Sequence, residues 1–287
     1  MVKPKLSIVL PARNEASGLQ QLLPALKNKY PNAEIVLVDD GSTDATAQLG
    51  REFGAQVVSH PYSKGNGAAI KSGARHATGT TLVFMDSDGQ HQVEDIPALL
   101  DRLDAGYDMA VGARNWSSQA NVGRGIANKL FNLLASWMVG HEVPDLTSGF
   151  RAVNAGKFRE YLHMLPNGFS YPTTITMAFF RAGHSVCYVP VEVLVRRGDS
   201  HINPVRDGLR FLLIIFRVGT LYSPLKLFLP ISVFFFLVGC SYYFYTFTTL
   251  HRFTNMSALL LITSLLVFLI GLVSEQITNL LFSKTDL

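Results

Sequence analysis

The first 115 residues alternate between short apolar runs of strand length and longer segments in which apolar positions recur with helical spacing. The apolar runs predict strands at residues 6–10, 34–38, 56–59, 81–85 and 109–111. The segments between them predict helices at residues 18–29, 43–53, 68–78 and 94–103. This regular alternation predicts an α/β fold, with a Rossmann-like, mostly parallel sheet and helices on both faces.

The end of the chain has a different pattern. Residues 227–250 form an uncharged run of 24 residues, which at 1.5 Å per helical residue is long enough for a bilayer core of about 30 Å. Residues 254–274 repeat the pattern, and we expect this second span to reach about residue 282. Buried helices of soluble proteins rarely run uncharged beyond about 14 residues, so two transmembrane helices forming a tight hairpin are the favoured interpretation.

Charge is concentrated between these two parts. The chain carries 25 Lys and Arg against 21 Asp and Glu, a net charge of +4. Residues 1–195 hold 17 of each sign, whereas residues 196–226 hold six basic against two acidic side chains. Because 48% of the chain is hydrophobic and the excess of basic residues is confined, we exclude a free cytosolic enzyme, a secreted disulfide scaffold and a nucleic-acid-binding protein.

We therefore expect a globular domain over residues 1–204, an amphipathic juxtamembrane segment over 205–226 and a hairpin over 227–287. The juxtamembrane segment alternates arginines with leucines and phenylalanines, which is typical of a helix in an anionic membrane interface and also compatible with an ordinary domain-closing helix. Its basic residues predict that the globular domain and both termini are cytosolic. Glu275, near the end of the second span, either pairs within the hairpin or emerges at the interface, and we favour the interface.

Polar residues follow the first two predicted strands, at the edge of the sheet where ligands bind in folds of this kind. The first strand leads into residues 11–15, Pro-Ala-Arg-Asn-Glu, and the second into residues 39–44, Asp-Asp-Gly-Ser-Thr-Asp. Asp39 and Asp40 point to opposite faces, so one can meet a nucleoside while the other fixes the loop. Ser42 or Thr43 can cap the next helix, with Asp44 in its first turn.

The fourth strand leads into residues 86–91, Asp-Ser-Asp-Gly-Gln-His. Two carboxylates this close repel each other unless a cation lies between them, and oxygen ligands of this kind suit Mg²⁺ or Mn²⁺. Gln90 could add an amide oxygen, and His91 either touches a phosphate or makes a structural hydrogen bond. The alternative is a solvated Asp-rich turn. A glycine-rich segment at residues 65–69 opens a helix, where it serves either phosphate binding or tight packing.

Four motifs occur in one order and at compatible spacing: residues 11–15, 39–44 and 86–88, followed by Ser-Gly-Phe-Arg at residues 148–151. Together they resemble the inverting family 2 glycosyltransferases with the GT-A fold. A chain of this length with a C-terminal membrane anchor is similar, within that family, to the dolichol-phosphate mannose synthases and the bacterial polyprenyl-phosphate glycosyltransferases. The resemblance covers residues 5 to about 200 by motif.

The resemblance implies that a nucleotide-diphosphate sugar, GDP- or UDP-linked, donates its sugar to a dolichyl or undecaprenyl phosphate. It assigns the nucleoside to Pro11, Ala12, Glu15 and Asp40, with Asp39 supporting their loop. It assigns the metal to Asp86, Asp88 and Gln90, and the acceptor phosphate to Arg114 and Arg124. It places Asp145 by the sugar and implies that Arg197 and Ser200 close over the diphosphate.

The chemistry needs no strong general base, because a lipid phosphate monoester is already anionic at pH 7. What must be supplied is positive charge at the departing nucleotide diphosphate. Arg114, Arg124, Arg151 and Arg197 are candidate clamps, and for each the alternative is a surface ion pair. A metal on the donor side and attack from the opposite side predict inversion at the anomeric carbon.

Two other functions remain open from the sequence. A processive polysaccharide synthase shares the catalytic motifs, but it carries a Gln-x-x-Arg-Trp motif that is absent here, and two spans make a poor polymer channel. A non-catalytic membrane partner of the same fold is disfavoured by the intact Asp86 and Asp88 pair. The sequence leaves open which sugar, nucleotide and metal ion are used, and it is compatible with a homo-oligomer.

Overall fold

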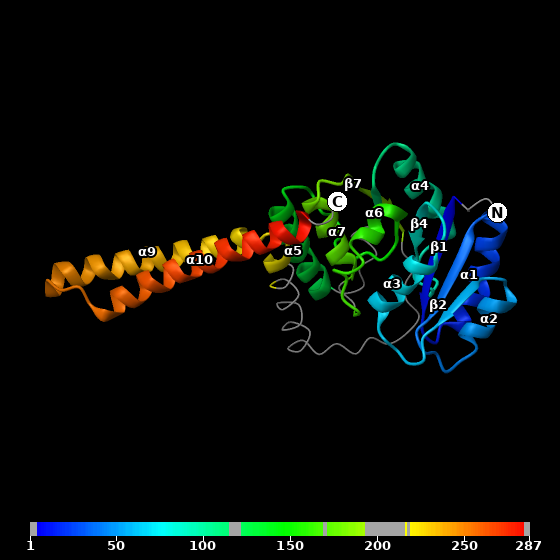
Figure 1. Ribbon diagram of the computed structural model, residues 1–287, viewed down its shortest axis with the longest axis horizontal. Coiled ribbons are helices and arrows are strands. Elements are labelled where there is room, and N and C mark those ends of the chain that lie inside the picture. The colour runs from blue at the N-terminus through cyan, green and yellow to red at the C-terminus, as the bar shows by residue number, and fades with distance from the viewer. Residues whose placement is uncertain (1–4, 115–121, 169–170, 193–215, 217–218, 284–287) are drawn as a thin grey trace. The chain divides into compact units, whose positions relative to one another are not determined.

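The computed structural model describes residues 5–114, 122–168, 171–192, 216 and 219–283. Only the backbone is described for residues 122–128, 130 and 283. The chain divides into two compact units, residues 1–201 and 202–287. Each unit is described here by itself, and Figure 1 labels the elements of both.

The first unit contains a seven-stranded sheet in the order β3-β2-β1-β4-β6-β5-β7. All of the pairings are parallel except those of β6, which lies antiparallel between β4 and β5. The strands are β1 (Leu6–Ala12), β2 (Glu34–Asp39), β3 (Gln56–Ser59), β4 (Thr81–Phe84), β5 (Met109–Arg114), β6 (Arg151–Asn154) and β7 (Val186–Val191).

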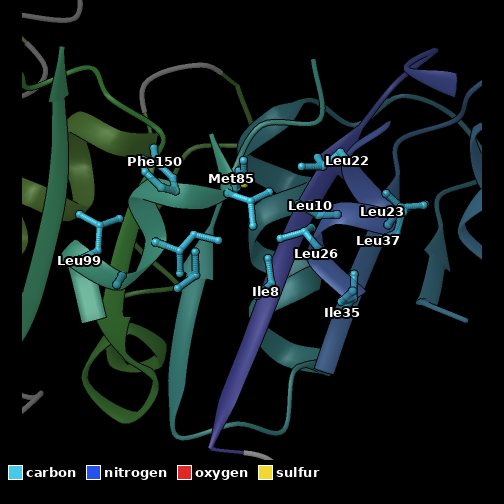
Figure 2. Packing of buried hydrophobic residues seen from close by; sticks show 14 of the residues in the cluster. Ile8, Leu10, Leu22, Leu23, Leu26, Ile35, Leu37, Met85, Leu99 and Phe150 are labelled. Atoms are coloured by element: carbon cyan, nitrogen blue, oxygen red, sulfur yellow. The ribbon is translucent and has the colours of Figure 1, made fainter. Parts of the chain in front are cut away.

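Helices cover both faces of this sheet (Figure 1). The connecting elements are α1 (Ala16–Lys29), α2 (Thr46–Glu52), α3 (Asn66–His76), η1 (Val93–Asp95), α4 (Ile96–Asp104), α5 (Val122–Val139), α6 (Ala155–Glu160) and α7 (Tyr171–Arg181). On one face, leucines of α1 and α4 pack on alternate residues of the central strands, including Ile8 and Leu10 of β1 (Figure 2). On the other face, Gly73 of α3 meets Val9, and Phe158 of α6 meets Phe84 at 4.6 Å between ring centroids.

The predicted α/β fold is confirmed, since a strand or helix of the structure overlaps every element expected in the first 115 residues. One difference is α2, which begins at Thr46 and not at residue 43. The elements from α5 to β7 had no counterpart in the prediction. Among them, β6 inserts an antiparallel strand into the middle of an otherwise parallel sheet.

The second unit contains α9 (Pro224–Leu250) and α10 (Asn255–Ser283), both long and apolar enough to cross a membrane. Small residues spaced by seven lie buried in each helix, at Ser232, Gly239 and Thr246 in α9 and at Ser257, Ser264, Gly271 and Thr278 in α10. Ser232 Oγ donates to Ser264 O at 3.0 Å, and Ser264 Oγ donates to Ser232 O at 2.9 Å. These small residues let two antiparallel helices approach closely and leave the large apolar side chains outside.

Glu275 differs from the favoured expectation. Its carboxylate accepts a hydrogen bond from the backbone N–H of Leu225 at 3.2 Å, in the first turn of α9. Glu275 therefore pairs within the hairpin, because the free N–H groups at a helix N-terminus attract a carboxylate. Most of the predicted amphipathic juxtamembrane segment, residues 205–215 and 217–218, lies outside the described residues.

Candidate functional site

The loops that follow β1 and β2 are joined by hydrogen bonds. The backbone N–H of Asn14 donates to Ser42 Oγ at 3.0 Å, and the backbone N–H of Thr43 donates to Asn14 Oδ1 at 2.8 Å. Asn14 adopts a left-handed conformation with φ of 56°, which asparagine tolerates better than most residues. The candidate donor-binding residues Pro11 and Ala12 end β1, and Glu15 lies in the loop after it, so all three are held in place by the sheet and by this loop pair.

Asp44, and not Ser42 or Thr43, caps the second helix. Asp44 Oδ1 accepts from the backbone N–H and the hydroxyl of Thr46, and Asp44 Oδ2 accepts from the backbone N–H of Ala16 at 3.2 Å. One carboxylate therefore serves the N-terminal turns of both α1 and α2. Ser42 and Thr43 contact Asn14 of the neighbouring loop instead, which corrects the cap expected from the sequence.

Asp40 is buried and fixes a loop that lies more than twenty residues further along the chain. Its Oδ1 lies 2.6 Å from His60 Nδ1 and accepts from Lys64 N at 2.8 Å. Its Oδ2 accepts from Ser63 Oγ at 2.8 Å and from Gly65 N at 2.9 Å. Burial opposes ionisation, but these hydrogen bonds, led by that from His60, outweigh it and lower the pKa of Asp40 to about 2.

Asp39 makes fewer contacts than Asp40. Its Oδ1 accepts from Ser42 N at 2.9 Å, and its Oδ2 has no hydrogen-bond partner among the described residues. The family resemblance assigned the nucleoside to Asp40 and loop support to Asp39, whereas the hydrogen bonds give the larger supporting role to Asp40. His60, which completes this support, was missed, although it directly follows β3 at the same edge of the sheet.

Asp86 and Asp88 follow β4 at the same edge of the sheet. Ser87 Oγ between them donates to Pro11 O at 2.9 Å, which ties this turn to the end of β1, and Gln90 N donates to Asp88 Oδ1 at 3.1 Å. Burial, and then the negative charge of Asp88, raise the pKa of Asp86 to about 6, although 38% of its side-chain surface is exposed. The two carboxylates therefore form an anionic site in which Asp88 disfavours the ionisation of Asp86.

These residues fit a divalent cation by the chemistry of their donor groups. Among the described residues, no group of three or more His, Cys, Asp and Glu side chains could enclose a metal ion. Mg²⁺ and Mn²⁺ sites that also bind substrate phosphates need only one or two carboxylates, and Asp86 and Asp88 supply two. Burial and the charge of Asp88 raise the pKa of Asp86, so a cation placed between the two carboxylates would favour their ionised forms.

His91 packs beside this pair as a neutral imidazole. Its ring stacks on Phe150 at 4.8 Å between centroids, and its Nε2 lies 3.9 Å from Asp86 Oδ2. Its Nδ1 is buried without a hydrogen-bond partner in the described part of the chain. Burial lowers the pKa of His91 to about 4, so the ring adds no positive charge near pH 7.

Arg114, at the end of β5, forms a bidentate ion pair with Asp145. Its Nε lies 2.7 Å from Asp145 Oδ2, and one Nη donates to Asp145 Oδ1 at 3.0 Å and to Thr147 Oγ1 at 2.6 Å. Burial opposes ionisation of Asp145, but the hydrogen bonds from Arg114 outweigh it and lower the pKa of Asp145. About a third of the Arg114 side chain, 31%, is exposed, and the other Nη has no partner among the described residues. Thr147 was not foreseen.

Arg151 is not a clamp for a phosphate. Its side chain is fully buried, and its Nη groups donate to Ser148 O, to Pro172 O at 3.3 Å and to Thr176 Oγ1 at 3.1 Å. Burial lowers the pKa of Arg151. The sequence expectation is wrong here, because β6 turns this side chain toward α7.

The N-terminus of α3 is also closed to a ligand. The backbone N–H groups of Gly67 and Ala68 donate to Gly168 O at 3.2 Å and to Asn167 O at 3.0 Å. A methyl group added at Gly67 would lie 2.1 Å from Pro166 O. The glycines of residues 65–69 therefore serve tight packing, which was one of the two alternatives left open.

The remaining candidates are not described. Arg197 and Ser200 lie outside the described residues, and Arg124 belongs to α5 but has no described side chain. The residues that the structure does bring to one edge of the sheet are those at the ends of β1, β2 and β5 and those directly after β1, β2 and β4.

Two family models match the chain. The model described as glycosyl transferase family 2 matches residues 7–162, and the model described as the GtrB C-terminal hairpin matches residues 223–280. The first match contains every candidate site residue before β7, and the second contains both apolar helices almost entirely.

Curated relatives cover most of the chain. The glycosyltransferase AglJ of Haloferax volcanii is 27% identical over 225 residues, which is 76% of this chain and 73% of the relative. The polyprenol monophosphomannose synthase of Mycolicibacterium smegmatis is 30% identical over 212 residues, 66% of this chain and 77% of the relative. The undecaprenyl-phosphate 4-deoxy-4-formamido-L-arabinose transferase of Edwardsiella ictaluri is 34% identical over 167 residues, but this match spans only 51% of that protein.

Solved structures show the same fold. Glucosyl-3-phosphoglycerate synthase from Mycobacterium tuberculosis, in complex with Mn²⁺, UDP and glucosyl-3-phosphoglycerate, has a TM-score of 0.59. It is 22% identical, and the match covers 76% of this chain and 78% of that one. At this level of identity the likeness concerns the fold alone, and it confirms the GT-A arrangement.

Proposed function

Because the chain belongs to glycosyl transferase family 2, we propose that it transfers one sugar from a nucleotide-diphosphate sugar to the phosphate of a polyprenyl lipid. Two relatives carry a polyprenol and an undecaprenyl phosphate in their names, which supports this class of acceptor. A protein of the same fold was solved with UDP and Mn²⁺, which supports a nucleotide-diphosphate donor and a divalent metal ion for this chain. The donor is GDP- or UDP-linked, and the acceptor is dolichyl or undecaprenyl phosphate.

The observation that carries the proposal is the carboxylate pair at the end of β4. Asp86 and Asp88 would hold Mg²⁺ or Mn²⁺, with Gln90 as a further oxygen donor. A divalent ion there would supply positive charge to the departing nucleotide diphosphate. The unusually high pKa of Asp86, about 6, supports a cation at this place.

Asp39 and Arg114 have polar groups left for substrates. We assign a nucleoside contact to Asp39, whose Oδ2 has no hydrogen bond to a described residue, and loop support to Asp40. Arg114 would direct its unpaired Nη to the acceptor phosphate, together with Arg124. Asp145 then acts by orienting Arg114 and neutralising part of its charge, because its lowered pKa makes it a weak base.

No general base is needed for the transfer itself. The second pKa of a phosphate monoester lies near 6, so the acceptor oxygen is largely ionised at pH 7 and can attack the anomeric carbon directly. The attack takes place opposite the departing diphosphate and therefore inverts the anomeric configuration. Arg197 and Ser200 are proposed to close over that diphosphate.

The membrane part of the protein is proposed to bring the catalytic domain to its lipid acceptor. The apolar helices α9 and α10 are proposed to span the bilayer as a hairpin, with the domain of residues 1–204 and both termini in the cytosol. The basic residues between 196 and 226 would bind anionic headgroups and hold the site near the lipid phosphate.

A donor panel tests this function. The full-length protein in detergent is incubated with GDP- and UDP-linked hexoses and with dolichyl or undecaprenyl phosphate, with and without EDTA. We expect a lipid carrying one sugar, formed with one of the nucleotides and abolished by EDTA. A polymeric product would indicate a processive synthase, and no product with any donor would indicate a non-catalytic partner.

A further inference from the structure

Arg151 is a buried cation without a carboxylate partner. No Asp or Glu oxygen of a described residue lies within 4.0 Å of its guanidinium, and its Nε makes no hydrogen bond in the described part of the chain. Such a charge is costly to bury, because backbone carbonyls and one hydroxyl replace water only partly. Packing alone therefore does not account for an arginine at this position.

The register of β6 places the segment before Arg151 beside the candidate metal site. Arg151 pairs with Phe84 of β4 on one side and with Val111 of β5 on the other. Gly112 N donates to Phe150 O at 2.9 Å, which continues the pairing beyond β6. Residues 148–150 thus run between the end of β4, which leads to Asp86, and the last residues of β5, which include Arg114.

At Gly149 this segment passes so close to Asp86 that a side chain would meet the carboxylate. A methyl group added at Gly149 would lie 3.2 Å from Asp86 Oδ2 and 3.2 Å from the hydroxyl oxygen of Tyr171. That hydroxyl donates to Gly149 O at 3.2 Å, and Arg151 donates to Ser148 O. The ring of Tyr171 is fully buried and lies 5.8 Å from the Arg151 guanidinium carbon.

We propose that Arg151 and Tyr171 are positioning residues, which hold the backbone of Ser148 and Gly149 against Asp86 and so fix this carboxylate for the metal ion. The inference rests on the proposed function, because it takes Asp86 as a metal ligand. This role accounts for the buried guanidinium of Arg151, which donates a hydrogen bond to Ser148 O in the segment beside Asp86.

Tyr171→Phe tests the inference with a single lost hydroxyl. Tyr188→Phe is the matched control, because the hydroxyl of Tyr188 is also buried but has no hydrogen-bond partner among the described residues. Mn²⁺ is titrated into each full-length protein in detergent, with GDP and separately with UDP, and bound Mn²⁺ is measured by electron paramagnetic resonance. We expect Tyr171→Phe to weaken Mn²⁺ binding by roughly two- to tenfold, the effect of one hydrogen bond, and Tyr188→Phe to leave it unchanged.

The same variants are compared for KM of the lipid phosphate and for melting temperature. We expect the KM of the acceptor to stay at the wild-type value, since Tyr171 contacts the wall beside Asp86 and not Arg114. Equal Mn²⁺ affinity in wild type and Tyr171→Phe would overturn the inference alone. A wild-type protein that binds no Mn²⁺ would overturn the metal site of the proposed function, and the inference with it.

Discussion

Replacement of Asp40 by Asn separates the roles of two adjacent aspartates. Each carboxylate oxygen of Asp40 accepts from one backbone N–H and one side chain of the loop at residues 60–65. An asparagine at this position keeps one acceptor oxygen and turns an NH₂ group toward donors. We therefore expect Asp40→Asn to loosen this loop and to destabilise the domain, with donor binding weakened only as a consequence.

The magnitude follows from the pKa of Asp40. A fall from 3.8 in the unfolded chain to about 2 in the folded protein corresponds to roughly 2 kcal/mol of stability at neutral pH. Because the folded-state pKa is the lower one, this stability is present above about pH 4 and is lost as the pH falls toward 2. For a unit of residues 1–201, a loss of this size lowers the melting temperature by about 4–8 °C.

The assay compares wild type, Asp40→Asn and Asp39→Asn in detergent by thermal unfolding and by KM for the donor. At pH 7, Asp40→Asn should melt several degrees lower, and the difference from wild type should shrink as the pH is lowered from 4 to 3. Asp39→Asn, whose amide oxygen can still accept from Ser42 N, should melt close to wild type but raise the donor KM. The reasoning is refuted if Asp39→Asn is the less stable variant, or if Asp40→Asn and wild type have the same melting temperature at pH 7.

Three further substitutions test other contacts. Arg114→Lys keeps the charge but loses the bidentate geometry toward Asp145, so kcat/KM for the lipid phosphate should fall at least about tenfold in steady-state assays, and wild-type kinetics would contradict its role. Ser87→Ala removes the bond to Pro11 O and should cost about 1 kcal/mol in thermal unfolding, whereas an unchanged melting temperature would show that this link is dispensable. Gly271→Leu should destabilise the hairpin by about 1–3 kcal/mol in unfolding by a denaturing detergent, since an added Cβ would lie 2.7 Å from Phe228 Cβ, and its control is Leu280→Ala, an exposed position that should have little effect.

The parts of the fold that could be predicted are those with a strong periodic pattern. The strands before Pro11, Asp39 and Asp86 are apolar runs bounded by polar motifs, and their carboxyl ends meet at one edge of a parallel sheet whatever the details of packing. The uncharged runs near the C-terminus are equally predictive, because apolar segments of their length are typical of membrane spans and rare in soluble cores. The apolar runs therefore suffice to bring these polar motifs to one edge of the sheet, where the structure has them.

The remaining features depend on contacts between residues distant in sequence. β6 has only four residues and begins with Arg151, so it offers no alternating pattern, and arginine is ordinarily exposed. Asp40, and not Asp39, supports the loop at residues 60–65, because His60 and Lys64 bind its carboxylate. These partners lie twenty or more residues further along the chain, so no local pattern shows them. Similarly, the pairing of Arg114 with Asp145 needs the loop after α5, whose position no local pattern gives.

Mn²⁺ binding to wild type and to Asp88→Ala is the most direct measurement. Bound Mn²⁺ is counted by electron paramagnetic resonance in the full-length protein with GDP or UDP, and folding of the variant is verified by its melting temperature. The account predicts that the wild-type protein binds Mn²⁺ with one of these nucleotides, and that Asp88→Ala, still folded, loses both this binding and sugar transfer. A folded Asp88→Ala variant that binds Mn²⁺ and transfers sugar as wild type does would contradict it.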